Sequence, residues 1–393
     1  MHQPALTMNM LHHYQPSSHL FASPQGTVMG HGCLERVHSS NQDQQLRGKA
    51  QDLLTRHPLT PLVFGVIPFH TDRAAQLIVP ERIAQYPATQ RPDAESHSDA
   101  NPLLSLRPQP SAAEFEQWVR EALQCLAPPT TLKKLVMARH LTAQLKHGLD
   151  RRALLSELWA KNPHGYTYSF ALDDEADPAT FLGASPELLL RKQGGTVYLN
   201  PLAGTALRHL EDHATDQARA QHLLASAKDQ REHAVVIENI VAALRPFCDV
   251  VEAAPTPSLV ATATLWHLST EIHAQLKAPY ADALQLALAV HPTPAVCGHP
   301  TLEARAEIER IEGIDRGFFA GAVGWMNQAG DGEWAVAIRC AHYEQNHLTL
   351  SAGAGVVLGS DPQAERIETG NKLRTLLNAL HTDPTMIQEG ITA

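Results

Sequence analysis

From residue 112 onward, apolar residues recur three or four positions apart in several stretches, as they do on one face of an amphipathic helix. In the longest of these stretches the apolar positions include Leu223, Val236, Ile240 and Leu244. Helices are expected near residues 112–126, 150–161, 212–247, 281–290 and 301–312.

Short apolar runs bounded by Gly, Pro, Asn or Asp predict strands between these helices. Gly330-Asp331-Gly332 lies between two of the runs and indicates a hairpin turn. Because runs of strands are separated from runs of helices, the pattern indicates an α+β fold: large antiparallel β-sheets packed together with helices on the outside. Strands are expected near residues 61–69, 166–172, 180–191, 318–327, 334–344 and 347–357.

Two segments before residue 112 lack this periodicity. Residues 1–50 are rich in His, Gln, Ser and Gly, and we expect a weakly structured N-terminal arm there. The prolines of residues 86–110 predict a long surface loop. Residues 51–393 are expected to form a single domain, with its motifs between about residues 120 and 380.

Composition limits the classes of partner. The chain has 393 residues, 44% of them hydrophobic, which is enough for a large core. The formal net charge of −10 argues against nucleic acid or an anionic membrane, so an anionic small substrate would need local cations or a metal. The five cysteines lie far apart, no signal peptide is evident and no apolar run is long enough to span a membrane, so we expect a cytoplasmic protein.

The last fifty residues carry the richest candidate chemistry. An apolar strand ends at a glycine-rich segment, Ala352–Val357, and a helix is expected to follow, with Asp361 as N-cap and Pro362 in its first turn. On that helix Glu365, Glu368 and Lys372 share one face. Two carboxylates on a rigid face suit a divalent metal, and the glycines would let backbone amides approach a small anion. A solvated helix with an ordinary Glu368–Lys372 pair is the alternative.

Two further segments supply a candidate acid and a candidate base. Glu187 precedes three leucines, and burial beside them would raise the pKa of its carboxyl, as a general acid requires. If residues 132–139 form a strand, Lys134 faces inward and Lys133 outward. Desolvation would then lower the pKa of Lys134 and leave its amine able to act as a base. The alternatives are a glutamate that faces water and two lysines at a strand edge.

Glu232 and Arg339 are the remaining candidates from residue chemistry alone. Glu232 shares a helix face with Val236 and could point into a pocket, although a Lys228–Glu232 ion pair would explain it equally well. Arg339 lies within an otherwise apolar strand, where a guanidinium needs an anionic partner, and a carboxylate held by two hydrogen bonds is the natural one.

In their order along the chain, these segments resemble the chorismate-utilising enzymes, and most closely the isochorismate synthases of siderophore or menaquinone pathways. The resemblance covers about residues 120–380 and implies the chorismate-binding fold of anthranilate synthase component I, with residues 51–393 as the catalytic domain. The matching segments are KLVMAR (134–139), GASPELLLR (183–191), PLAGTA (201–206), KDQREH (228–233), TATLWHL (262–268), HPTPAVCG (291–298), FFAGAVGW (318–325), EWAVAIR (333–339) and AGAGVVLGSDPQAERIETGNK (352–372).

The resemblance implies a role for each matched position. Lys134 would be the base that activates water and Glu187 the acid that protonates the departing C4 hydroxyl of chorismate. Mg²⁺ would be held on the ring carboxylate by Glu232, Glu365 and Glu368. The activity implied is the Mg²⁺-dependent, reversible conversion of chorismate to isochorismate by water addition at C2. The implied substrate-binding positions are Gly204, His267, Ala295, Val296, Arg339, Gly353, Ala354, Gly355 and Lys372.

Two positions separate the relatives. Members that use ammonia resemble this pattern but carry Gln where Lys134 stands, and members with an enzymic amine nucleophile carry Lys where Ala203 stands. We therefore expect no glutaminase subunit, a monomer, and water as the nucleophile. A salicylate synthase, which also eliminates pyruvate, is the main alternative. A binder of chorismate-like metabolites without activity is a weaker one, because every acid, base and metal position is filled.

Overall fold

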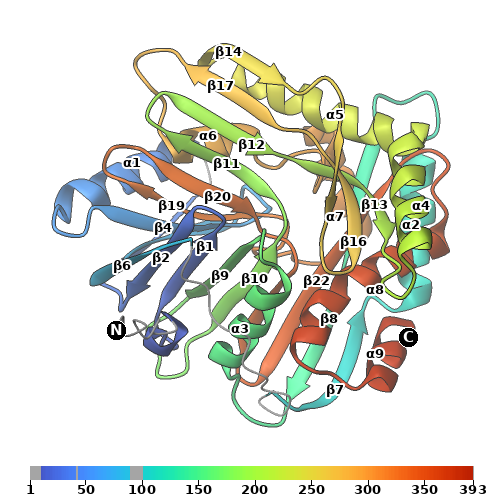
Figure 1. The fold of residues 1–393 in the computed structure, drawn as a ribbon, viewed down its shortest axis with the longest axis horizontal. Helices are drawn as coiled ribbons and strands as arrows, with labels where there is room; N and C mark the ends of the chain where they lie inside the picture. Colours follow the sequence, from blue (N-terminus) through green and yellow to red (C-terminus); the bar gives the residue numbers. More distant parts are fainter. Residues whose placement is uncertain (1–9, 41–42, 89–100, 393) are drawn as a thin grey trace, which may run out of the picture.

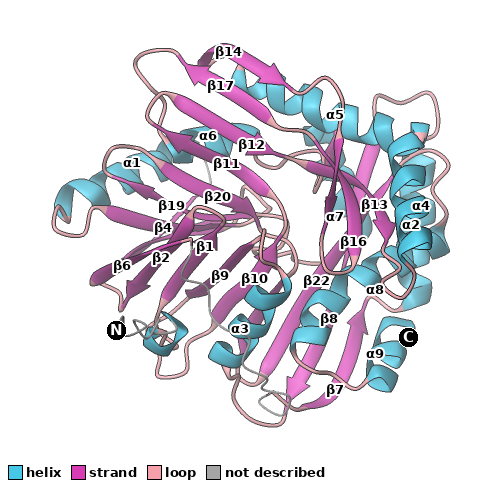
Figure 2. Ribbon diagram, in the orientation of Figure 1, coloured by secondary structure: helices cyan, strands magenta, loops and turns pink. Residues whose placement is uncertain are grey.

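Two large antiparallel sheets face one another across the main hydrophobic core, and most helices lie at the periphery (Figures 1 and 2). This computed structural model describes residues 10–40, 43–88 and 101–392. Within these residues no helix is long and apolar enough to cross a membrane. Phe64, Phe170 and Trp334, from different strands of the two sheets, are fully buried in the shared core.

The first sheet contains ten described strands. The long strand β8 pairs with β22 along most of its length, and its two ends also pair with β18 and β7. In order across the sheet the strands are β18 (Gly298–His299), β8 (Lys134–Leu145), β22 (His347–Val356), β21 (Cys340–Glu344), β10 (Thr180–Ser185), β9 (Tyr166–Ala171), β1 (His19–Ser23), β2 (Gly26–His31) and β6 (Arg82–Pro87), with β7 (Leu103–Gln109) beside β8.

The second sheet contains nine described strands, and a small third sheet lies at its end. The second is ordered β14 (Cys248–Ala253), β17 (Ile272–Leu276), β12 (Thr196–Asn200), β11 (Leu188–Gln193), β20 (Gly332–Val336), β19 (Ala322–Asn327), β4 (Leu62–Ile67), β5 (Ala74–Val79) and β3 (Glu35–Ser40). The third is β13 (Leu202–Leu207), β16 (Leu265–Ser269) and β15 (Ser258–Ala261).

Local sequence signals set several helix boundaries. Ser111 and Glu114 form a capping box at the start of α2, and the Asp361 carboxylate accepts a 2.8 Å bond from the backbone N–H of Ala364 at the start of α8. The helices are the 3₁₀ turn η1 (Met10–His13), α1 (Asp43–Arg56), α2 (Ala112–Cys125), α3 (Arg151–Lys161), α4 (His213–Ala225), α5 (Ala227–Leu244), α6 (Ala283–Val290), α7 (Thr301–Glu312), α8 (Pro362–Ala379) and α9 (Pro384–Thr392).

Three predicted elements are in fact pairs of elements. The helix expected over 212–247 breaks at Ser226, whose extended backbone ends α4 and whose hydroxyl caps α5 through the N–H of Asp229. The strand expected over 180–191 divides at Pro186, and the one over 334–344 divides before Cys340. In both strands the chain leaves one large sheet and joins the other. A continuous apolar run cannot reveal this change of sheet, because both halves are buried.

Residues 1–50 are more regularly structured than we expected. Within the predicted weakly structured arm, β1 and β2 are strands of the first sheet and β3 is a strand of the second. All of β1 is buried, including His19 and Ser23. Polar residues at buried positions removed the hydrophobic signal on which the prediction depended. Residues 1–9 lie outside the described residues, as do 89–100 of the predicted loop, but the end of that loop is β7.

Candidate active site

The site lies where two neighbouring segments pass from one large sheet to the other. The first segment joins β10 to β11 and contains Glu187, and the second joins β20 to β21 and contains Arg339. The N–H of Ala184 donates to the carbonyl of Arg339 at 3.0 Å, and the N–H of Val336 donates to the carbonyl of Glu187 at 3.1 Å. The two crossings are therefore tied together through the backbone, and each presents one ionisable side chain to the same pocket.

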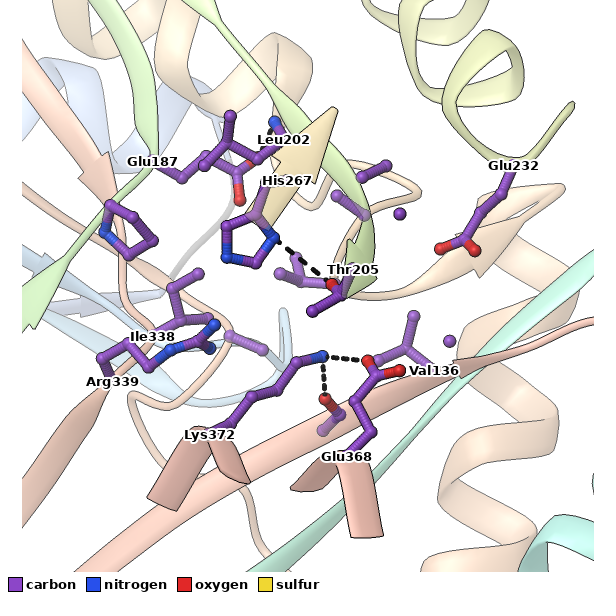
Figure 3. A pocket seen from close by; sticks show the side chains of 18 of the residues that line it. Val136, Glu187, Leu202, Thr205, Glu232, His267, Ile338, Arg339, Glu368 and Lys372 are labelled. Atoms are coloured by element: carbon purple, nitrogen blue, oxygen red, sulfur yellow. Dashed lines mark hydrogen bonds and ion pairs between the residues drawn. The ribbon is translucent and has the colours of Figure 1, made fainter. Parts of the chain in front are cut away.

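Glu187 is 3% exposed, and its Oε1 accepts a 3.4 Å hydrogen bond from the N–H of Leu202 (Figure 3). Burial raises the pKa of its carboxyl to about 7, although that N–H and the charges of Lys134, Arg339 and Lys372 oppose the rise. The expected raised pKa is confirmed. Such a carboxyl is protonated in a large fraction of molecules at neutral pH and can donate a proton.

Arg339 has a backbone φ of +51°, a left-handed conformation that costs a non-glycine residue about 1–3 kcal/mol. Its side chain is buried, and burial lowers the pKa of the guanidinium to about 10, while the carboxylates of Glu368 and Glu187 oppose the shift. Within the described part of the chain no side chain is hydrogen bonded to this guanidinium. A buried guanidinium that no side chain satisfies is suited to bind an anionic ligand.

The third sheet forms another wall of the pocket. Between Ala203 and Thr205 the pairing of β13 with β16 shifts register at Gly204, whose φ of +78° favours glycine. The Nδ1 of His267 lies 3.3 Å from the Thr205 hydroxyl, and its buried Nε2 has no hydrogen-bond partner among the described residues. Burial lowers the pKa of His267 to about 3, so the imidazole is neutral and can hydrogen bond a ligand.

The strand pair β8–β22 contributes the candidate base. As predicted from alternation, Lys134 faces inward with its side chain 2% exposed, whereas Lys133 is exposed. The Lys134 ammonium donates a 2.8 Å hydrogen bond to the Glu232 carboxylate. A Cβ at Gly355 would lie 2.9 Å from both Lys134 Cε and Glu232 Oε1, so only glycine leaves room for this pair.

Each of the three candidate metal ligands contacts a lysine. Lys134 pairs with Glu232, the Lys228 ammonium lies 3.6 Å from the Glu365 carboxylate, and Lys372 lies 2.6 Å from Glu368. These carboxylates come from α5 and α8. Lys372 also donates a 2.7 Å bond to the carbonyl of Gly353, which fixes its ammonium in the pocket (Figure 3).

The electrostatics of these carboxylates fit a cation. Burial, followed by the charge of Glu368, raises the pKa of Glu365 to about 7, and Glu232 adds to the rise. Burial would also raise the pKa of Glu232, but Lys134 outweighs it and the pKa is below its usual value. No group of three His, Cys, Asp or Glu side chains is assembled as metal ligands within the described ranges. The mutual repulsion of three carboxylates nevertheless suits a hard divalent ion.

One pocket, with about 640 Å³ of empty space, brings most of the sequence-predicted residues together. Three predicted residues do not line it: Lys134 is hydrogen bonded to Glu232 of the lining, Glu365 is close enough to Glu368 for that charge to raise its pKa, and Ala354 is fully buried. The predicted residues that line it are Glu187, Gly204, Glu232, His267, Ala295, Val296, Arg339, Gly353, Gly355, Glu368 and Lys372.

Sequence reasoning did not select the uncharged remainder of the lining. Val136 could have been found from strand alternation, because it shares a face with Lys134. Thr205 and Phe319 fall inside matched segments but carried no separate signal. The lining residues absent from the prediction are Val136, Pro186, Leu202, Ala203, Thr205, Phe319, Ala320 and Ile338.

This fold and site are those of a chorismate-binding protein. The family of chorismate binding enzymes matches residues 59–381, and the chain belongs to that family. It is 43% identical over 385 residues to isochorismate synthase DhbC of Bacillus subtilis (strain 168), covering 95% of this chain and 96% of the relative.

Solved structures agree on the fold. A Bacillus anthracis crystal structure assigned to a 2,3-dihydroxybenzoate-specific isochorismate synthase, DhbC, superposes with a TM-score of 0.89 at 39% identity, covering 96% of this chain and all of that one. Anthranilate synthase component I from Streptococcus pneumoniae TIGR4 superposes with a TM-score of 0.73 at 20% identity, covering 90% and 92% of the two chains. The expected α+β, anthranilate synthase component I-like fold is confirmed.

Proposed function

We propose that this chain is an isochorismate synthase, an isomerase that adds water at C2 of chorismate as the C4 hydroxyl leaves. The observation that carries the proposal is a buried carboxyl with a pKa near 7 in the pocket, together with a buried lysine that is hydrogen bonded to Glu232 in the pocket wall. The 43% identity to an isochorismate synthase over nearly the whole chain supports it.

The reaction needs one proton removed from water and one delivered to the leaving hydroxyl. Lys134 would accept the first as a neutral amine, once its ammonium has released a proton to solvent, and Glu187 would donate the second. Hydroxyl is exchanged for hydroxyl, so no carbon is oxidised or reduced and the reaction is reversible. Each turnover leaves Lys134 protonated and Glu187 ionised, and exchange with solvent restores both.

The other lining residues would hold the substrate. Arg339 and Lys372 would bind carboxylates of chorismate, with the backbone at Gly353 to Gly355 close by. His267, being neutral, would donate or accept a hydrogen bond through Nε2, and Gly204 leaves space beside it. Ala295 and Val296 supply a small apolar wall.

The three glutamates near the pocket are also the candidate ligands of a magnesium ion. Glu232, Glu365 and Glu368 would hold it, and when bound it would offset the negative charge of the ring carboxylate. Removal of metal by EDTA is expected to abolish turnover, and added Mg²⁺ to restore it. Undiminished activity in the chelator would contradict this part of the proposal.

We also propose that the enzyme acts alone, as a cytoplasmic monomer without a glutaminase subunit. Ala203 lines the pocket and has no amine that could attack the ring, while Lys134, hydrogen bonded to Glu232 of the pocket wall, would activate water. The five described cysteines are all free thiols, which suits a reducing compartment.

The test is to incubate the purified protein with chorismate and Mg²⁺ and to identify products by chromatography. Isochorismate alone is expected, also with excess ammonium salts. Salicylate together with pyruvate would move the chain to the salicylate synthases, and an aminated product to the ammonia-using branch. Binding of chorismate without any product would indicate the inactive binder.

A further inference from the structure

A second cavity lies behind the Lys134–Glu232 pair. It is open to solvent, with about 1000 Å³ of empty space counted together with that opening, and is lined by the loop between α2 and β8, the first residue of β8, the first turns of α5 and the residues just after β22. Glu232 lines both cavities, and Lys134, which lines the second, lies against Gly355 of the first. The ion pair is therefore a shared wall.

The charged lining of this second cavity is strongly basic. It contains Lys133, Lys134, Lys228 and Arg231, and its one acidic residue is Glu232, already paired with Lys134. Lys133 and Arg231 have no acidic partner within the described ranges. In a chain with a net charge of −10, this local excess of cations would attract an anion.

The rest of the cavity is apolar. Leu126, Leu132, Val235 and Val357 line it, and Leu358, 58% exposed, stands at its margin. A free phosphate would gain nothing from these side chains, and an apolar molecule would gain nothing from the cations. A ligand that uses both has a flat apolar body and a carboxylate at one end.

We propose that the second cavity is a binding site for a small cyclic carboxylate. Two sources share that chemistry. One is the substrate of the proposed function, held here on its way to the first cavity. The other is an aromatic carboxylate that acts as an effector through Lys134 and Glu232. The choice of source rests on the proposed function, whereas the existence of the site does not.

The binding test uses benzoate, which has the ring and the carboxylate but cannot react. The double variant Lys133→Gln/Arg231→Gln is expected to raise the Kd of benzoate, measured by calorimetry, by about tenfold and to weaken its dependence on salt. Leu358→Glu, at an exposed position, should raise the Kd comparably by placing a negative charge at the margin. The control Lys49→Gln/Lys277→Gln makes the same change of net charge at exposed positions outside this cavity and should leave the Kd unchanged.

Because no turnover is needed, the binding result stands even if the proposed reaction is wrong. A Kd unchanged in the Lys133/Arg231 and Leu358 variants, but raised in Arg339→Gln, would place benzoate in the first cavity only and overturn the proposal. Equal behaviour of the test and control double variants would also overturn it.

Kinetics with chorismate then separate the two sources. If substrate is held here first, the Lys133/Arg231 double variant lowers kcat/KM severalfold at low salt while kcat is unchanged, and benzoate inhibits competitively. If the ligand is an effector, the variant keeps the wild-type kcat/KM, and benzoate changes kcat even at saturating chorismate.

Discussion

Buried ionisable side chains are accommodated differently on the two sides of the candidate active site. On the sheet side, Glu187, Arg339 and His267 have no ion-pair partner among the described residues, and burial shifts the pKa of each in the direction that favours its uncharged form. On the helix side, formed by α5 and α8, the glutamates each contact a lysine. His267 is neutral at pH 7 and Glu187 is largely protonated there, Arg339 remains a buried cation that a ligand can pair with, and the helix-side glutamates are already paired.

The difference has consequences for function. The segments that carry Glu187 and Arg339 are tied together by backbone hydrogen bonds across the two crossings, so these two residues are ready to donate or bind without rearrangement. The helix-side groups must exchange lysine contacts for ligand contacts when a cation binds. We therefore expect changes on the sheet side to act on turnover or on substrate binding, and changes on the helix side to act on metal affinity.

The largest expected effect is on the sheet side. Glu187→Gln should lower kcat by about 10²–10⁴-fold, because the amide cannot protonate the departing hydroxyl. Stopped-flow or steady-state measurement of isochorismate formation gives the value. Glu333→Gln is the matched control, because burial also raises the pKa of Glu333 to about 7, but it lies outside the pocket. A similar loss of kcat in both variants would show that replacing a buried carboxyl, and not removing the proton donor, lowers turnover.

Ionisation of the buried Glu187 carboxyl should lower the free energy of unfolding at high pH. The folded-state pKa of Glu187 is about 7, above the unfolded value of 4.5. Its protonation therefore supports the fold fully below pH 4.5, and that support is lost as pH rises to about 7. Relative to its stability at pH 4, wild type should lose about 3 kcal/mol more than Glu187→Gln by pH 8. Urea unfolding at several pH values checks this, and parallel pH profiles would contradict it.

The candidate acid and base could be predicted from the sequence, but the arrangement of strands that positions them could not. Lys134 and Glu187 could be selected because strand alternation and apolar neighbours are local signals. The proximity of Glu187 and Arg339 could not be predicted, because it depends on two neighbouring segments that both pass from one large sheet to the other. The strand β1 was missed for a similar reason. Its polar residues are buried, and the environment that buries them is set by segments distant in the sequence.

On the helix side, we predict that Lys134 competes with Mg²⁺ for Glu232. Lys134→Met keeps the aliphatic stem but leaves the carboxylate unpaired, so the Kd for Mg²⁺ without chorismate should fall by about tenfold. Calorimetry measures this directly, whatever the effect on turnover. Lys133→Met removes the same charge one residue away and should change the Kd much less. Unchanged affinity in Lys134→Met would show that Glu232 does not hold the metal.

The smallest predicted effect concerns the contact that orients His267. Thr205→Val removes the hydroxyl 3.3 Å from Nδ1 while keeping the shape of the side chain, so the imidazole loses one of the groups that fix its ring. Loss of a single neutral hydrogen bond is worth about 0.5–1.5 kcal/mol, which corresponds to an increase in the KM for chorismate of about two- to twelvefold, with kcat little changed. Because the pKa of His267 is about 3, this ratio should be the same from pH 5 to pH 8. Thr264→Val, outside the pocket, is the control. A KM ratio that changed with pH over this range would mean that His267 binds substrate as a cation, and the contrast between the two sides of the site would then fail at this residue.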